Sequence, residues 1–140
     1  MGEVILRDAL TVHLNAADIE VTSAGTARWH VGEPMDPRAA ASLRRGGYEP
    51  EASPGIYANA EFLHTIDVAI AMTREHRTDL LARRPDLPVL LVSEVLGQGT
   101  LDVPDPYFGS DEDFDACRAT LESAAPLLVS EILRLRDLSK

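Results

Sequence analysis

Residues 102–109, which read Asp-Val-Pro-Asp-Pro-Tyr-Phe-Gly, have the clearest potential for chemistry in this sequence. Two prolines fix φ and disfavour helix at the residues before them, so Asp105 is expected on a stiffened loop with its carboxylate exposed. Tyr107 and Phe108 follow directly and add two aromatic rings to the loop. A carboxylate can transfer protons, and aromatic rings can form an apolar wall. The alternative is that these are ordinary turn residues with one ring in the core.

The segment behind this loop predicts the start of a long helix. Ser110 and Asp113 have the spacing of a capping box, in which each residue satisfies a backbone N–H near the helix start. The final helix is predicted from Asp111 to Arg136 by its apolar period. Its expected core positions are Phe114, Leu121, Ala125, Leu128 and Ile132.

The rest of the chain alternates between helical and strand-like patterns. Helices are predicted at 1–14, 38–45 and 74–84, strands at 18–22, 67–72 and 89–92, and loops at 23–26 and 49–59. Asp36 and Pro37 are expected to cap and open the second helix, which Gly46 and Gly47 close. This alternation predicts an α/β fold, a three-layer sandwich with a short parallel sheet.

Length and composition indicate one globular domain over residues 1–140. The chain is 45% apolar and 26% charged, and its net charge is −10. This acidic balance argues against nucleic acid or an anionic membrane surface as a partner. No apolar run approaches the roughly 20 residues of a membrane span. A soluble protein is therefore expected, with no membrane partner.

Cysteine and histidine usage narrows the chemistry further. Cys117 is the only cysteine, so no internal disulfide forms, and a cytoplasmic location is expected. The four histidines show no ligand-like pairing with each other or with Cys117, so we expect no metal and no other cofactor. The sequence leaves the oligomeric state open, with a homodimer among the alternatives.

Several motifs resemble, in order and spacing, the low-molecular-weight protein tyrosine phosphatase family. The resemblance spans nearly the whole chain. The motifs that carry it are Thr22-Ser23-Ala24-Gly25-Thr26, Trp29-His30-Val31-Gly32, Asp36-Pro37-Arg38-Ala39, Asp105-Pro106-Tyr107-Phe108-Gly109 and Asp113-Phe114. It implies the phosphotyrosine phosphatase I fold and hydrolysis of a phosphotyrosine protein or a small aryl phosphate through a cysteinyl-phosphate.

The resemblance also assigns expected roles to residues of this chain. Asp105 corresponds to the general acid that protonates the departing phenolate. Trp29, Tyr107 and Phe108 correspond to the walls that hold the substrate ring. Ser23 corresponds to a serine that supports the phosphate-binding loop.

The residues that attack and bind phosphate do not match within this chain. Family members begin with a strand and a C-x5-R-S-P loop, and the residue after that proline corresponds to Met1. Cys117 does not fit this loop, because position 123 is serine and acidic neighbours raise a thiol pKa. Ser53 and Ile56 stand where the family commonly has histidine and arginine.

Two hypotheses remain open from the sequence: a phosphatase whose first strand and nucleophile loop lie ahead of Met1, and a non-catalytic pseudophosphatase that binds aromatic or phosphotyrosine ligands. In the family fold the absent strand lies between residues 19–22 and 67–72. Residues 1–140 alone are therefore expected to be unstable, or to borrow a strand from a partner. An arsenate reductase of similar fold is disfavoured, because that chemistry needs several cysteines.

Overall fold

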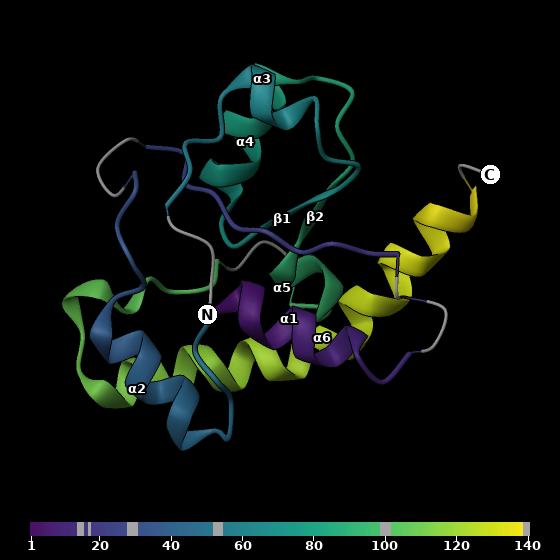
Figure 1. The fold of residues 1–140 in the computed structure, drawn as a ribbon. Helices are drawn as coiled ribbons and strands as arrows, with labels where there is room; N and C mark the ends of the chain where they lie inside the picture. The colour runs from purple at the N-terminus through teal and green to yellow at the C-terminus, as the bar shows by residue number, and fades with distance from the viewer. Residues whose placement is uncertain (14–15, 17, 28–30, 52–54, 99–101, 139–140) are drawn as a thin grey trace.

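A short parallel sheet between two groups of helices forms the centre of the molecule (Figure 1). The computed structural model describes residues 1–140 except 14–15, 17, 28–30, 52–54, 99–101 and 139–140. In the described part, the helices are α1 (Gly2–Leu10), α2 (Pro37–Arg45), α3 (Ala60–Leu63), α4 (Arg74–Arg83), α5 (Val92–Val95), the 3₁₀ turn η2 (Pro106–Phe108) and α6 (Asp111–Leu138); the strands are β1 (Ala69–Ala71) and β2 (Val89–Leu91). This arrangement confirms the predicted α/β class.

The two strands divide their side chains between two cores. β1 and β2 pair in parallel, with Ile70 opposite Leu90 and Ala69 opposite Val89. Ile70 and Leu90 pack with the core of α1 and α6, whereas Ala69 and Val89 pack with residues of α3 and α4. This is the alternation of a strand covered on both faces, so the helices form the outer layers.

The long helix α6 provides most of the lower layer in Figure 1 and packs along α1 and α2. All five predicted core positions of α6 are buried, with exposed fractions of 7% or less. Their 3.6-residue spacing places them on one apolar face, which explains why the sequence predicted them correctly.

The α2 helix begins and ends as predicted. Asp36 is its N-cap and accepts a hydrogen bond from the Arg38 backbone N–H at 2.8 Å, and Pro37 fills the first helical position. At the other end Gly47 has φ of +90°, a conformation that residues with a Cβ rarely adopt. The Arg38 guanidinium also donates to Asp36 and holds the pKa of that carboxyl below its ordinary value of 3.8.

Replacing Asp36 with alanine is expected to lower the free energy of unfolding by about 1 kcal/mol, the usual loss for an N-cap. Because the Asp36 pKa is lowered in the folded protein, the ionic part of this stabilisation is present above pH 3.8 and is lost as the pH falls further. Urea unfolding at pH 7 and pH 3 measures both effects. Asp36→Asn should cost less than alanine at pH 7, since it keeps a cap oxygen.

The strand predicted at residues 18–22 is wrong. Ile19 and Val21 do pack against the core of α1 and α6, as the alternating pattern required. However, residues 18–22 contain no strand, and neither β1 nor β2 pairs with them. The Ile19 N–H donates to Ala16 O, and Val21 O accepts from the Arg7 side chain. The alternation therefore identified the half-buried side of the segment. It could not identify a strand, because a strand also needs backbone hydrogen bonds to a neighbouring strand.

Smaller differences concern element ends. α1 ends at Leu10 rather than residue 14, and both strands are shorter than predicted. The short helix α5, which begins directly after β2, was not predicted from the sequence. None of the helices in the described part of the chain is long and apolar enough to cross a membrane.

Candidate active site

The loop that carries Asp105 follows α5 in the sequence and is hydrogen-bonded beside the carboxyl end of β1. The Val103 N–H donates to Met72 O at 3.0 Å, and the Val103 side chain is buried. One residue earlier, Asp102 accepts a hydrogen bond from the Arg74 N–H at 2.9 Å, at the start of α4. These contacts place the loop at the edge of the sheet where sites in parallel α/β folds usually lie.

Asp105 caps the short turn η2 and is exposed, as the two prolines predicted. Its Oδ1 accepts a hydrogen bond from the Tyr107 N–H at 3.0 Å. No described residue donates a hydrogen bond to its Oδ2. One oxygen of the carboxylate is thus held by the backbone, and the other is open to a ligand.

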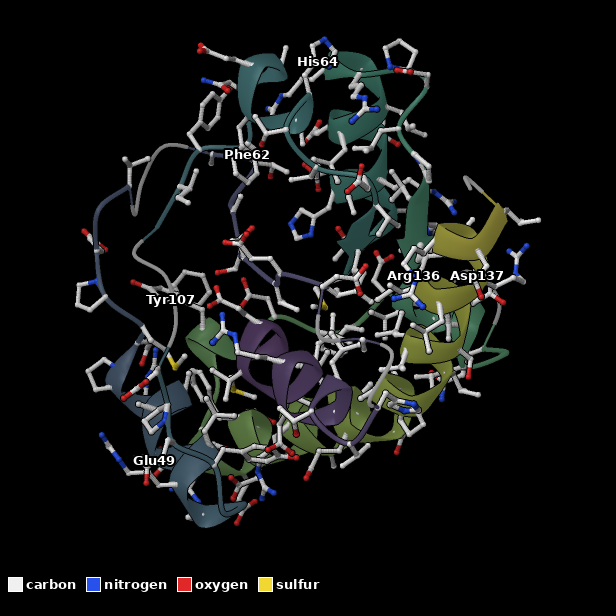
Figure 2. All side chains as sticks on the ribbon, turned by 45° about the vertical axis from the view of Figure 1, so that its right-hand side comes forward. Glu49, Phe62, His64, Tyr107, Arg136 and Asp137 are labelled. Atoms are coloured by element: carbon white, nitrogen blue, oxygen red, sulfur yellow. The ribbon has the colours of Figure 1, made fainter. Side chains whose placement is uncertain are left out.

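Tyr107 and Phe108 form an edge-to-face pair with ring centroids 4.9 Å apart. Tyr107 is 44% exposed and Phe108 is 96% exposed, so neither ring belongs to the core. The alternative reading, in which one of these aromatics is a core residue, is therefore wrong. Arg136 and Asp137 lie near the C-terminal end of α6. In Figure 2, Tyr107 lies on the opposite side of the molecule from these two residues.

The loop ends in the capping box that the sequence predicted. The Ser110 N–H donates to Asp113 Oδ2 at 2.8 Å, and the Asp113 N–H donates back to Ser110 Oγ at 3.4 Å. A Cβ on Gly109 would lie 2.3 Å from Asp113 Oδ2, so only glycine fits without moving the box. The loop is thus anchored at β1 and at the start of α6.

The start of α1 meets the same edge of the molecule. A Cβ on Gly2 would lie 2.9 Å from the end of the Met72 side chain, and Met72 O is the acceptor for Val103. Figure 1 likewise shows the N-terminus beside the loop that precedes η2. The α1 start, the end of β1 and the Asp105 loop therefore lie together.

Ser23 connects the extended segment after residue 18 to α1. Its hydroxyl donates to Glu3 Oε1 at 2.6 Å. Glu3 is only 5% exposed and forms an ion pair with Arg7, whose guanidinium also donates to Val21 O at 2.9 Å. A buried carboxylate is stable only when it is paired and hydrogen-bonded in this way. Ser23 is thus tied to the first turn of α1.

Cys117 lies half-buried in α6. Burial is the main cause that raises the pKa of its thiol; the negative charge of Asp105 also raises it, and the Met1 amino group opposes the shift. The predicted direction is confirmed, but burial contributes more than acidic neighbours do. The described residues include no group of three or more histidine, cysteine, aspartate or glutamate side chains arranged to hold a metal.

Some predicted residues cannot be placed, and one residue at the loop was missed. Trp29 and Ser53 lie outside the described residues. Ile56 O accepts a hydrogen bond from the Gly25 N–H at 2.8 Å.

The missed residue is Arg38, which donates to Tyr107 O at 2.7 Å. The sequence around Arg38 indicated only the start of a helix. The hydrogen bond to the Asp105 loop could not be predicted from it, because the acceptor carbonyl is 69 residues away.

These features define an α/β protein with a carboxylate and an aromatic pair on a loop at the carboxyl end of its parallel sheet. Comparison with known proteins gives the family. Residues 1–137 match the family described as low molecular weight phosphotyrosine protein phosphatase. The chain therefore belongs to the low molecular weight protein tyrosine phosphatase family, as its motifs predicted.

Individual relatives agree with this assignment. Low molecular weight protein-tyrosine phosphatase A of Mycobacterium tuberculosis is 38% identical over 114 residues, which cover 77% of this chain and 68% of the relative. The human low molecular weight phosphotyrosine protein phosphatase is 28% identical and covers 89% of this chain and 86% of its own.

Solved structures agree on the fold. A protein tyrosine phosphatase from Entamoeba histolytica superposes with a TM-score of 0.85 at 23% identity, over 95% of this chain and 87% of that chain. A low molecular weight phosphotyrosine phosphatase from Vibrio cholerae has a TM-score of 0.79 at 30% identity, over 94% and 86%. The chain thus has the fold of these enzymes.

Proposed function

We propose that residues 1–140 form one domain that supplies the proton donor and the aromatic wall of a protein tyrosine phosphatase. The reaction is hydrolysis of a phosphomonoester through a cysteinyl-phosphate, with Asp105 as the general acid. Family membership supports the reaction class. The observation that carries the assignment of Asp105 is its exposed carboxylate, with one oxygen held by the Tyr107 N–H and the other open.

The chemistry explains why a proton donor matters here. The phenol of tyrosine has a pKa of about 10, so the phenolate is a poor leaving group at neutral pH. A carboxylic acid within hydrogen-bond reach of the ester oxygen can protonate it as the bond to phosphorus breaks. Asp105 lies directly before the exposed aromatic pair, and its carboxylate combines exposure with an orientation held by the Tyr107 N–H.

The substrate in this proposal is a phosphotyrosine protein or a small aryl phosphate. Tyr107 and Phe108 have exposed rings next to Asp105, which supports their assignment as walls for the substrate ring. Trp29 is proposed as the facing wall on the resemblance alone.

Ser23 is proposed to support the phosphate-binding loop, and its bond to Glu3 in α1 is consistent with that role. The proposed location is the cytoplasm.

In this proposal the nucleophile belongs to a C-x5-R-S-P loop joined ahead of Met1, because the cysteine of residues 1–140 does not fit the motif. Cys117 is followed six positions later by Ser123, and its thiol pKa is raised. A thiol with a raised pKa holds little reactive thiolate at neutral pH. The α1 start lies beside the Asp105 loop, so a loop joined to Met1 would enter the site.

Residues 1–140 alone are expected to show no turnover of p-nitrophenyl phosphate, whereas an extended chain, with a strand and a C-x5-R-S-P loop joined ahead of Met1, should be active. The reason is that only the second protein has a thiolate and a guanidinium for phosphorus. Steady-state phosphate release by both proteins gives the measurement. Cys117→Ser in the extended chain is the control and should keep full activity. Turnover by residues 1–140 that disappears in Cys117→Ser would overturn the proposal.

A second candidate function is binding without catalysis. It is favoured by the 96% exposed Phe108 ring and by Ile56, which stands where the family commonly has arginine. Calorimetry of residues 1–140 with a phosphotyrosine peptide tests it, with Phe108→Ala as the matched variant. Absence of binding heat would eliminate this candidate, and binding that Phe108→Ala weakens would support it.

A further inference from the structure

We propose that Arg38, at the start of α2, is a positioning residue that holds the Asp105 loop in its working orientation. This inference rests on the proposed role of Asp105 as the general acid. The Arg38 guanidinium donates from Nη2 to Tyr107 O at 2.7 Å and from Nη1 to Gly109 O at 3.4 Å. Both acceptors are backbone carbonyls of the loop, on a segment far from α2 in the sequence.

Tyr107 connects Arg38 to the Asp105 carboxylate. Arg38 fixes Tyr107 at its carbonyl, while the N–H of the same residue donates to Asp105 Oδ1 at 3.0 Å. A shift of Tyr107 would therefore change the direction of the carboxylate. Displacements of about 1 Å in a catalytic group can cost about 100-fold in rate, so this constraint is relevant to the chemistry.

The surroundings of the guanidinium favour arginine over lysine. The guanidinium carbon lies 4.7 Å from the centre of the Phe114 ring and 5.5 Å from that of Tyr107. Asp36 accepts from Nη2 at 3.1 Å and from Nε at 3.3 Å. A planar cation with several fixed donors can satisfy these partners together, whereas the point charge of lysine cannot.

A purely local role for Arg38 would be to pair with the N-cap Asp36. That pairing uses Nε and one bond of Nη2. The other two hydrogen bonds of the Arg38 guanidinium join it to the carbonyls of Tyr107 and Gly109, which are 69 and 71 residues away in the sequence. Arg45, at the other end of α2, is the matched comparison, because it pairs with Asp115 and contacts neither Tyr107 nor Gly109.

The first test needs no catalysis. The chain has three tyrosines, Tyr48, Tyr57 and Tyr107, so labelling with 3-fluorotyrosine gives three fluorine resonances that Tyr→Phe variants assign. Arg38→Ala should move and sharpen the Tyr107 resonance as its ring becomes mobile, and leave Tyr57 unchanged. Arg45→Ala should leave Tyr107 unchanged. An unmoved Tyr107 resonance in Arg38→Ala, or an equal change in Arg45→Ala, would overturn the inference.

The second test uses the extended chain. Arg38→Ala should lower kcat by about 10- to 100-fold with little change in KM, and Arg38→Lys should recover only a small part. Asp105→Asn combined with Arg38→Ala should be no slower than Asp105→Asn alone, because Arg38 acts through Asp105. The positioning role of Arg38 would be contradicted if the kcat losses of the two single variants multiplied in the double variant, or if Arg38→Lys had the full wild-type kcat. If Asp105→Asn has no effect, the proposed function fails, while the fluorine result still decides whether Arg38 holds the loop.

Discussion

Asp105→Asn is expected to lower kcat of the extended chain by about 10²- to 10⁴-fold, the usual contribution of a general acid. Asparagine keeps the shape of the side chain and can still accept the Tyr107 N–H, so the loop should keep its fold. It has no proton to give to the leaving oxygen. Steady-state kinetics with aryl phosphates provide the measurement.

The size of the loss in Asp105→Asn should depend on the leaving group of the substrate. The loss should be larger with phenyl phosphate than with p-nitrophenyl phosphate, because the more acidic nitrophenol needs less protonation as it departs. Asp111→Asn is the matched control, since Asp111 is an exposed carboxylate at the start of α6. Equal losses for Asp105→Asn and Asp111→Asn, or equal losses with both esters, would show that Asp105 is not the acid.

Arg7→Met is expected to lower the free energy of unfolding by about 3 kcal/mol. Removing one partner of a buried ion pair costs about 3–5 kcal/mol, and the lower end applies because the Arg7 side chain is 43% exposed. The Glu3 side chain is 1% exposed and would lose the guanidinium that compensates its charge. Arg7→Met also removes the bond to Val21 O, so residues 19–22 should lose order. Chemical denaturation monitored by circular dichroism gives the free energy.

Arg134→Met is the control for this prediction. Arg134 pairs with Glu131 on α6, but both side chains are more than one-third exposed, so solvent screens the pair and the expected loss is much smaller than for Arg7→Met. A Glu3→Gln, Arg7→Met double variant should be more stable than Arg7→Met alone, since glutamine is neutral and does not need the guanidinium of Arg7. The explanation is wrong if Arg7→Met and Arg134→Met cost the same.

Local patterns predicted the parts of the fold that depend on neighbouring residues in the sequence. The Asp36 cap, the Ser110 and Asp113 box and the buried face of α6 are each determined within a few residues, and the structure has all of them. The predicted strand at residues 18–22 depended on a pairing partner, which alternation cannot reveal. The sequence therefore predicted which side of that segment packs against the core, but not its hydrogen bonding.

The same distinction applies to the candidate site. The exposed loop position of Asp105 and its two aromatic neighbours was predicted, because prolines and rings are visible in the sequence. Arg38 was missed because its acceptor is a backbone carbonyl 69 residues away, and the contact between Ser23 and Glu3 was missed because 20 residues separate them. Contacts of this kind follow from how the chain packs, so they need the structure.

The exposed ring of Phe108 could contribute to the affinity for a ligand that covers it. Fully covering a phenylalanine side chain is worth about 1.5–3 kcal/mol, which is roughly a tenfold to hundredfold gain in affinity. Phe108 is 96% exposed, so almost none of this gain is used within the chain itself. The ring of a small aryl phosphate can pack against only one side of Phe108, as the proposed wall requires. A polypeptide lying across the loop could cover it, so the length of a ligand, as well as its phosphate, should affect how tightly it is held.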